Sequence, residues 1–158
     1  MSAVQAQELP EQALLARYSD VGHTDCYFTD VPRDVTFEAY ISAFYTSWLF
    51  KVERIILRLV KRPSTDVQVA ELAAGTRAQF AAWDVEDRTV DQLLMCDMAG
   101  RTRSWLHCTP VEGGKRLYFG SAVVPDQKSG KMGWLSHALM GFHKLYSVML
   151  LKAAVRKL

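Results

Sequence analysis

The strongest constraint on the fold is a change in the spacing of apolar residues at Gly75. Before this glycine, over residues 36–60, apolar side chains recur every three or four positions, which is the spacing of one face of a helix. After it, β-favouring residues come in short runs separated by turn signals, which is typical of strands. From Trp134 to the C-terminus the helical spacing returns. The pattern predicts an α+β fold, in which a curved antiparallel sheet wraps on a long C-terminal helix and shorter helices follow the first strand.

The helical part of the chain is predicted to contain a break. Three aromatic residues close to Ser47 would fall on more than one face of a continuous helix, so two short helices within residues 36–60 would bury them better. A further short helix is predicted between Thr65 and Gly75. Residues 65–68 have the spacing of a capping box, and glycine suits the position after a helix end.

Five strands are predicted, an edge strand over residues 25–29 and a four-stranded antiparallel meander. The meander strands are expected at residues 77–86, 90–98, 102–110 and 115–124. Their connections are a turn near residues 87–89 and two-residue hairpin turns at Ala99–Gly100 and Gly113–Gly114. Because register determines which side chains share a face, these turns place Met98 opposite Arg101 and Glu112 opposite Lys115.

Neither face of this predicted sheet is polar, so both faces are expected to be covered. The C-terminal helix would cover one face, and the N-terminal helices or a second subunit would cover the other. One face carries large rings together with a few hydrogen-bonding groups, and it is interpreted as the wall of a ligand pocket, with Gly120 opposite His107 leaving space. Plain hydrophobic core is the alternative interpretation of the same residues. The sequence leaves open which face is concave.

The predicted ligand-binding residues come from this face and from the C-terminal helix. They are Trp83, Leu94, Cys96, Arg103, Trp105, His107, Tyr118, Phe142 and Tyr146. Arg103 would meet a ligand carboxylate through its planar donor fork, or pair with an acid at the sheet rim. His107 is the candidate proton shuttle or ligand anchor, with a buried structural histidine as the alternative.

The length and net charge of the chain restrict its domain organisation and the kinds of partner it can bind. The chain has 158 residues and a formal net charge of +2, from 19 basic and 17 acidic residues. We expect a single domain over residues 1–158, with residues 1–20 as a peripheral or partly flexible segment. The charge balance gives no electrostatic case for nucleic acid or an anionic membrane. The most apolar run, residues 39–50, is too short for a membrane span.

No cofactor or metal is predicted. The glycine motifs of nucleotide-binding loops do not occur, and His137 and His143 are six residues apart, so they point to different sides of a helix. Three cysteines cannot all pair within one chain, and the N-terminus lacks the pattern of a secretory signal. Reduced thiols and a cytoplasmic location are therefore expected.

Four runs in the strand region carry a resemblance to a known family. They are FAAW at 80–83, DQLLMCD at 91–97, GRTRSWL at 100–106 and LYFGSA at 117–122. These runs resemble an uncharacterised bacterial family allied to the START-like superfamily, also known as SRPBCC. The resemblance implies a helix-grip fold, although that superfamily usually has seven strands and only five are predicted here. It also implies an apolar ligand between sheet and helix, since START-like members hold lipids, sterols or polyketides there.

Three functions follow as hypotheses. The first is binding of a small hydrophobic molecule in a cavity between the sheet and the C-terminal helix. The second is an enzyme of the polyketide cyclase or dehydratase type that uses the same cavity, with His107 as general acid or base. The third is a homodimeric interaction domain without a ligand, in which the second apolar sheet face packs against an identical subunit.

Overall fold

A computed structural model of the chain describes residues 2–125 and 134–158, and the side chains of residues 2–125 and 143–158. It contains seven strands: β1 (Gln5–Ala6), β2 (His23–Val31), β3 (Gln79–Phe80), β4 (Trp83–Arg88), β5 (Gln92–Asp97), β6 (Thr102–Val111) and β7 (Gly114–Val123). The helices are a 3-10 helix η1 (Leu14–Tyr18), then α1 (Phe37–Thr46), α2 (Trp48–Leu59), α3 (Asp66–Ala74) and α4 (Trp134–Lys157). The predicted α+β class is confirmed.

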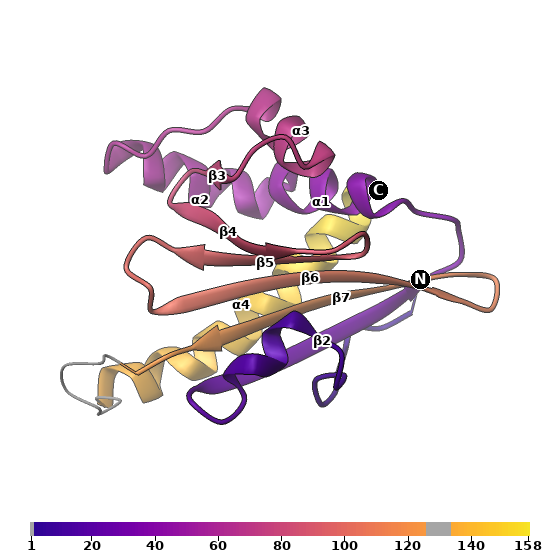
Figure 1. Ribbon diagram of the computed structural model, residues 1–158, viewed down its shortest axis with the longest axis horizontal. Coiled ribbons are helices and arrows are strands. Elements are labelled where there is room, and N and C mark those ends of the chain that lie inside the picture. Colours follow the sequence, from indigo (N-terminus) through magenta and orange to yellow (C-terminus); the bar gives the residue numbers. More distant parts are fainter. Residues whose placement is uncertain (1, 126–133) are drawn as a thin grey trace.

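All seven strands form one antiparallel sheet, in the order β1-β2-β7-β6-β5-β4-β3. The consecutive strands β3 to β7 make the predicted meander, and β2 joins it beside β7. In Figure 1, α4 crosses the sheet on one side and the indigo N-terminal segment lies on the other. We refer to the side that packs against α4 as the helix face of the sheet and to the other side as the outer face.

The three central helices begin and end where the local signals predicted. α1 and α2 are separate helices that meet at Ser47, whose extended backbone (ψ 152°) breaks the chain direction and whose hydroxyl group accepts a hydrogen bond from the Phe50 amide. The capping box at the start of α3 is present between Thr65 and Gln68. Gly75 ends α3 in the left-handed conformation, with φ 81°.

The structure has seven strands where the sequence predicted five. Four of the five predicted strands exist as single strands, but the one predicted over residues 77–86 is a hairpin of β3 and β4, in which Phe80 pairs with Trp83. The remaining strand, β1, has two residues, too few to show an alternating pattern. Because β1 pairs with Tyr27 and Phe28, β2 is the second strand of the sheet and not its edge over that length.

The predicted register at Gly113–Gly114 is wrong. Val111 pairs with Gly114, so the turn consists of Glu112 and Gly113, the latter with φ 75°. Gly114 is already part of β7, where a Cβ atom would collide with the carbonyl oxygen of Val31. The shift is two residues, so every side chain keeps its face but changes its partner. Gly120 therefore lies opposite Trp105, and not opposite His107.

The predicted turn near residues 87–89 lies later in the chain, and Trp83 does not lie on the sheet face that was predicted for it. Thr89 and Gln92 bracket the turn, with the Thr89 amide donating to the Gln92 carbonyl oxygen at 2.9 Å. A register shift between Val85 and Asp87 adds a residue to β4. As a result Trp83 packs on the helix face, with the main core.

The core consists of two layers, one on each face of the sheet. The helix-face layer joins the sheet to α1, α3 and α4, and includes Tyr40, Phe44, Leu93, Leu106, Phe119 and Leu151. The outer-face layer is smaller and consists of Ala13, Leu15, Cys26, Leu94, Trp105, Tyr118 and Ala122. Leu15 of η1 is fully buried in it. The predicted cover of this face by the N-terminal helices is wrong, because α1 and α3 join the helix-face layer. The segment that contains η1 covers the outer face instead.

A candidate ligand cavity beneath the C-terminal helix

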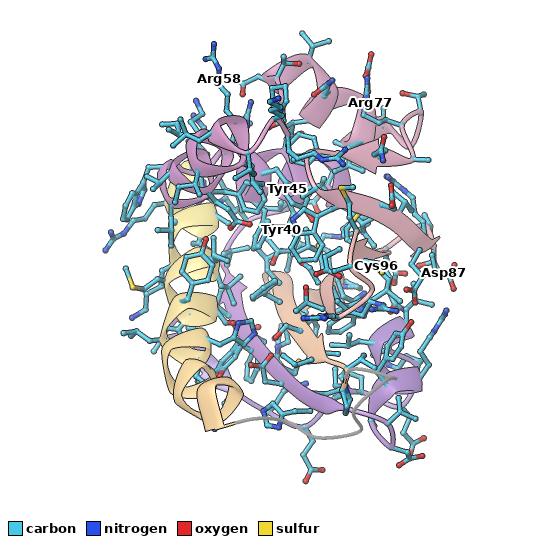
Figure 2. The ribbon with its side chains drawn as sticks, turned by 90° about the vertical axis from the view of Figure 1, so that its left-hand side faces the viewer. Tyr40, Tyr45, Arg58, Arg77, Asp87 and Cys96 are labelled. Atoms are coloured by element: carbon cyan, nitrogen blue, oxygen red, sulfur yellow. The ribbon has the colours of Figure 1, made fainter. Side chains whose placement is uncertain are left out.

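An unfilled space of about 210 Å³ lies between the helix face of the sheet, the α1–α2 junction and α4. Its walls combine aromatic rings with a few polar groups. The lining residues are Phe44, Tyr45, Phe50, Glu53, Trp83, Thr102, Arg103, Ser104, Phe119, Ser121, His143, Tyr146 and Leu150. Figure 2 shows Tyr45, which forms part of this wall, in the interior between α4 and the sheet.

Two small side chains explain why the core is open at this end. Ser104 of β6 and Ser121 of β7 are cross-strand partners, and both line the space. The next residues on the same face, Leu106 and Phe119, are also partners and fill their part of the core. Since protein interiors are close-packed, replacing two large side chains by two serines in one row leaves a gap that α4 spans without filling.

Two wall residues at one end of the cavity, Ser121 and His143, are linked to Asp25 of β2, which is not itself a lining residue. The Ser121 hydroxyl group donates to Asp25 Oδ1 at 2.6 Å, and His143 Nε2 lies 2.5 Å from the same hydroxyl oxygen. With its proton donated to Asp25, the serine oxygen can accept from the tautomer of His143 that carries hydrogen on Nε2. The serine is thus the central member, which differs from a nucleophilic triad, where the histidine is central.

Asp25 also carries an unsatisfied oxygen. Its side chain is 10% exposed and its Oδ2 atom has no hydrogen-bond partner among the described residues. His143 Nε2, at 3.9 Å, is too far for a hydrogen bond. A buried carboxylate oxygen without a partner is costly, which makes it a strong acceptor for any donor that reaches it past Ser121 and His143.

A second carboxyl group lies in the wall of the same cavity. The Tyr146 hydroxyl group of α4 donates to Glu53 Oε2 of α2 at 2.5 Å. Burial raises the pKa of Glu53, although the hydrogen bond from Tyr146 opposes the shift. Burial and the nearby carboxylate likewise raise the pKa of Tyr146. The cavity wall therefore contains one carboxyl group whose pKa is raised, which is the direction of shift expected of a general acid.

Replacing Glu53 with glutamine is expected to raise the free energy of unfolding at neutral pH. Because the pKa of Glu53 is raised in the folded state, its contribution to stability is complete below the ordinary glutamate pKa and is lost as the pH rises through the raised value. Glutamine keeps an oxygen that accepts from Tyr146 and carries no charge. Urea unfolding from acidic to neutral pH would show a gain that disappears toward acid. The exposed Glu112→Gln is the control, and an equal gain at both pH extremes would contradict this explanation.

The structure separates the predicted ligand-binding residues into two groups. Trp83 and Tyr146 line the cavity, and so does Arg103. The Arg103 guanidinium group, however, bonds on the outer face to Glu86 at 2.6 Å and to the Tyr18 hydroxyl oxygen at 3.0 Å. Arg103 therefore pairs with an acid, which was the alternative to a ligand carboxylate. The side chain of Phe142 lies outside the described residues.

The other predicted residues lie on the outer face and do not face the cavity. They are Leu94, Cys96, Trp105, His107 and Tyr118, which lie on the strands that face η1 or beside that layer. In Figure 2, Cys96 lies across the sheet from α4. The face interpreted as a pocket wall is thus the covered outer face, where the alternative interpretation, plain core, describes Leu94, Trp105 and Tyr118.

His107 has the contacts of a structural histidine. It is 3% exposed, its Nδ1 atom lies 2.8 Å from the Asp91 carbonyl oxygen, and its ring stacks on Tyr118 with centroids 5.2 Å apart. Because these contacts lie on the outer face, His107 does not meet a ligand beneath α4. The histidine that does line the cavity is His143.

Sequence reasoning missed the polar wall residues Glu53, Thr102, Ser104, Ser121 and His143, and also Asp25, which contacts Ser121 from behind the wall. Two of them had a local signal. Glu53 is the only acid in α2, where a polar residue at a buried position is informative, and Ser121 interrupts the apolar helix-face positions of β7. Asp25 and Ser121 are 96 residues apart in the sequence, so only the pairing of β2 with β7 brings them together.

The described part of the chain was compared with the requirements of a metal site and of a membrane-spanning helix. No group of three or more histidine, cysteine or acidic side chains is arranged to hold a metal ion among those residues. Within the same residues, no helix is both long enough and apolar enough to cross a bilayer.

Comparison with solved structures gives distant similarities. The chain is similar to the crystal structure of CalU16 from Micromonospora echinospora, with 7% sequence identity over 99% of this chain and 92% of that chain and a TM-score of 0.36. No family model matches the sequence, and no curated protein does.

Proposed function

We propose that this chain binds a small, largely apolar molecule in the cavity between the sheet and α4. The observation that supports the proposal is an unfilled space of about 210 Å³ bordered by the helix-face core. Binding sites of this kind are mostly apolar, with sparse polar groups that orient the ligand. We also propose that residues 1–158 form one START-like domain built around this site.

The dimensions and the polar groups define the class of ligand. A cavity of about 150 Å³ accepts benzene, so the space of about 210 Å³ beneath α4 suits a molecule of about eight non-hydrogen atoms. Its apolar part would contact Phe44, Phe50 and Phe119. Its polar part would be a hydrogen-bond donor or a cation, since the unsatisfied group next to the wall residue Ser121 is the Asp25 Oδ2 acceptor.

Filling the cavity tests the proposal. Ser104→Leu introduces a large side chain into the wall, and Ser104→Ala removes the same hydroxyl group while leaving the space open. We expect Ser104→Leu to weaken binding of benzylamine, measured by chemical-shift titration, on the order of tenfold or more, since the lost contacts are those of a buried ring. Ser104→Ala should bind nearly as the parent protein does. Equal titration curves for all three proteins, each shown to be folded, would contradict binding at this site.

The raised pKa of Glu53 favours a second candidate, an enzyme that uses the same cavity for acid–base chemistry. Here Glu53 would give a proton to the bound molecule, and His143 or Asp25 would accept one. Glu53→Gln separates the two functions: it would abolish turnover of a substrate and leave its binding intact. The second measurement is to incubate the protein with a molecule that copurifies with it. If that molecule stays unchanged, the binding function alone remains.

A further inference from the structure

An exposed apolar stripe runs along α2. Trp48, Val52, Ile55, Ile56 and Leu59 share one side of this helix, and Ile55 and Leu59 are 63% and 80% exposed. These positions are spaced three and four residues apart, so they form one continuous strip over the length of the helix, about 18 Å. Apolar side chains that are exposed singly need no explanation, but a contiguous row on one helix marks a contact surface.

Basic residues follow this stripe along one side and beyond its end. Lys51, Arg54 and Arg58 lie on α2, and Lys61 and Arg62 come directly after it. Lys51 and Arg54 share the carboxylate of Asp66. No ion pair of Arg58, Lys61 or Arg62 is present within the described residues, where all three are exposed. Figure 2 shows Arg58 extending away from the body of the protein.

The acidic residue of α2 does not neutralise this surface. Glu53 lies on the opposite side of the helix and accepts a hydrogen bond from Tyr146 of α4. The formal net charge of +2 therefore conceals a local excess of positive charge beside the apolar stripe. A helix with an apolar strip bordered by lysine and arginine is the arrangement of interfacial helices, which lie in the plane of a membrane surface.

We propose that α2 docks on the surface of an anionic lipid bilayer. The apolar stripe would enter the boundary between headgroups and acyl chains, and Arg58, Lys61 and Arg62 would contact the lipid phosphates. This inference does not depend on the proposed ligand, because the cavity lies on the other side of α2.

Charge argues against a second copy of the chain as the occupant. In a two-fold contact through the stripe, the same surface is used by both copies, so their arginines and lysines would border one interface. Asp66, the nearby acid, is already paired with Lys51 and Arg54. Like charges with no acidic partner oppose such a dimer, whereas an anionic surface satisfies all of them at once.

Co-sedimentation with vesicles tests the proposal. The full chain is expected to pellet with vesicles of phosphatidylcholine mixed with phosphatidylglycerol, much less with phosphatidylcholine alone, and less as the salt concentration rises. The double variant Arg58→Gln/Arg62→Gln should bind about 30-fold more weakly, from the loss of two surface cations near an anionic membrane. Ile55→Gln/Leu59→Gln should lose on the order of tenfold or more.

Matched controls separate docking from general surface effects. Val67→Gln and Val90→Gln remove apolar side chains that are 69% and 92% exposed elsewhere and should pellet as the parent protein does. Trp48, which is part of the stripe, should show a blue shift in fluorescence with the anionic vesicles, and Trp48→Phe should lose that shift while still pelleting. Equal pelleting with both vesicle types would overturn the proposal. So would a dimer in sedimentation velocity that Ile55→Gln/Leu59→Gln dissociates.

Discussion

Trp105→Ala is expected to lower the free energy of unfolding by about 3–5 kcal/mol, the range for truncating a large buried aromatic residue. Trp105 is fully buried between the outer face and the N-terminal segment. Its Nε1 atom donates to Gln92 Oε1 at 2.9 Å, and the same oxygen accepts from the amide of Leu14 in η1. Removing the ring leaves a cavity and loosens the contact that holds η1 on the sheet.

Guanidinium unfolding measures this loss, and Trp48→Ala provides the matched control. Trp48 is 56% exposed, so the same truncation on α2 should change stability by less than about 1 kcal/mol. The comparison also decides between two functions for the outer face. If Trp105 formed the wall of a ligand-filled pocket, the ligand-free protein would tolerate alanine there at little cost. A small loss would therefore contradict the assignment of this face to the core.

The elements that could be predicted from the sequence are those with a local cause. The break at Ser47 and the capping box at Thr65 depend on residues within four positions of each other, and both are present. Trp134 begins α4, as the return of the helical spacing indicated. The hairpin at Gly100 has its predicted register, since Cys96 pairs with Arg103. These signals depend on neighbouring residues, so they predict the local structure correctly without knowledge of the tertiary structure.

The features that could not be predicted depend on contacts between distant residues. Either glycine at 113 and 114 suits a hairpin turn, and the choice is made by Val31, whose carbonyl oxygen leaves no room for a side chain at Gly114. The two faces of the sheet are both apolar, so alternation alone does not show which one α4 covers. Because of this ambiguity, the sequence prediction assigned Trp105, His107 and Tyr118 to the pocket wall, although the cavity lies on the other face of the sheet.

Asp25→Asn is expected to reduce the affinity for benzylamine about tenfold to a hundredfold, the worth of one hydrogen bond to a charged group. Asp25 Oδ2 is buried and has no partner among the described residues, so an ammonium group that reached it would gain a charge-assisted hydrogen bond. Asparagine keeps an oxygen for the Ser121 hydroxyl group, which now bonds to Oδ1 at 2.6 Å, and removes the charge.

Toluene makes this experiment specific, because it has the same ring without the ammonium group. Chemical-shift titrations of the parent protein should show tighter binding of benzylamine than of toluene, and Asp25→Asn should abolish that difference while toluene binds as before. Asp87→Asn, on the partly exposed strand β4 and paired with Arg17, should leave both titrations unchanged. Equal losses for both molecules in Asp25→Asn would mean that the aspartate maintains the cavity wall. Because a neutral side chain replaces a carboxylate with an unpaired oxygen, the free energy of unfolding should not fall, and a large decrease would likewise assign Asp25 a structural role.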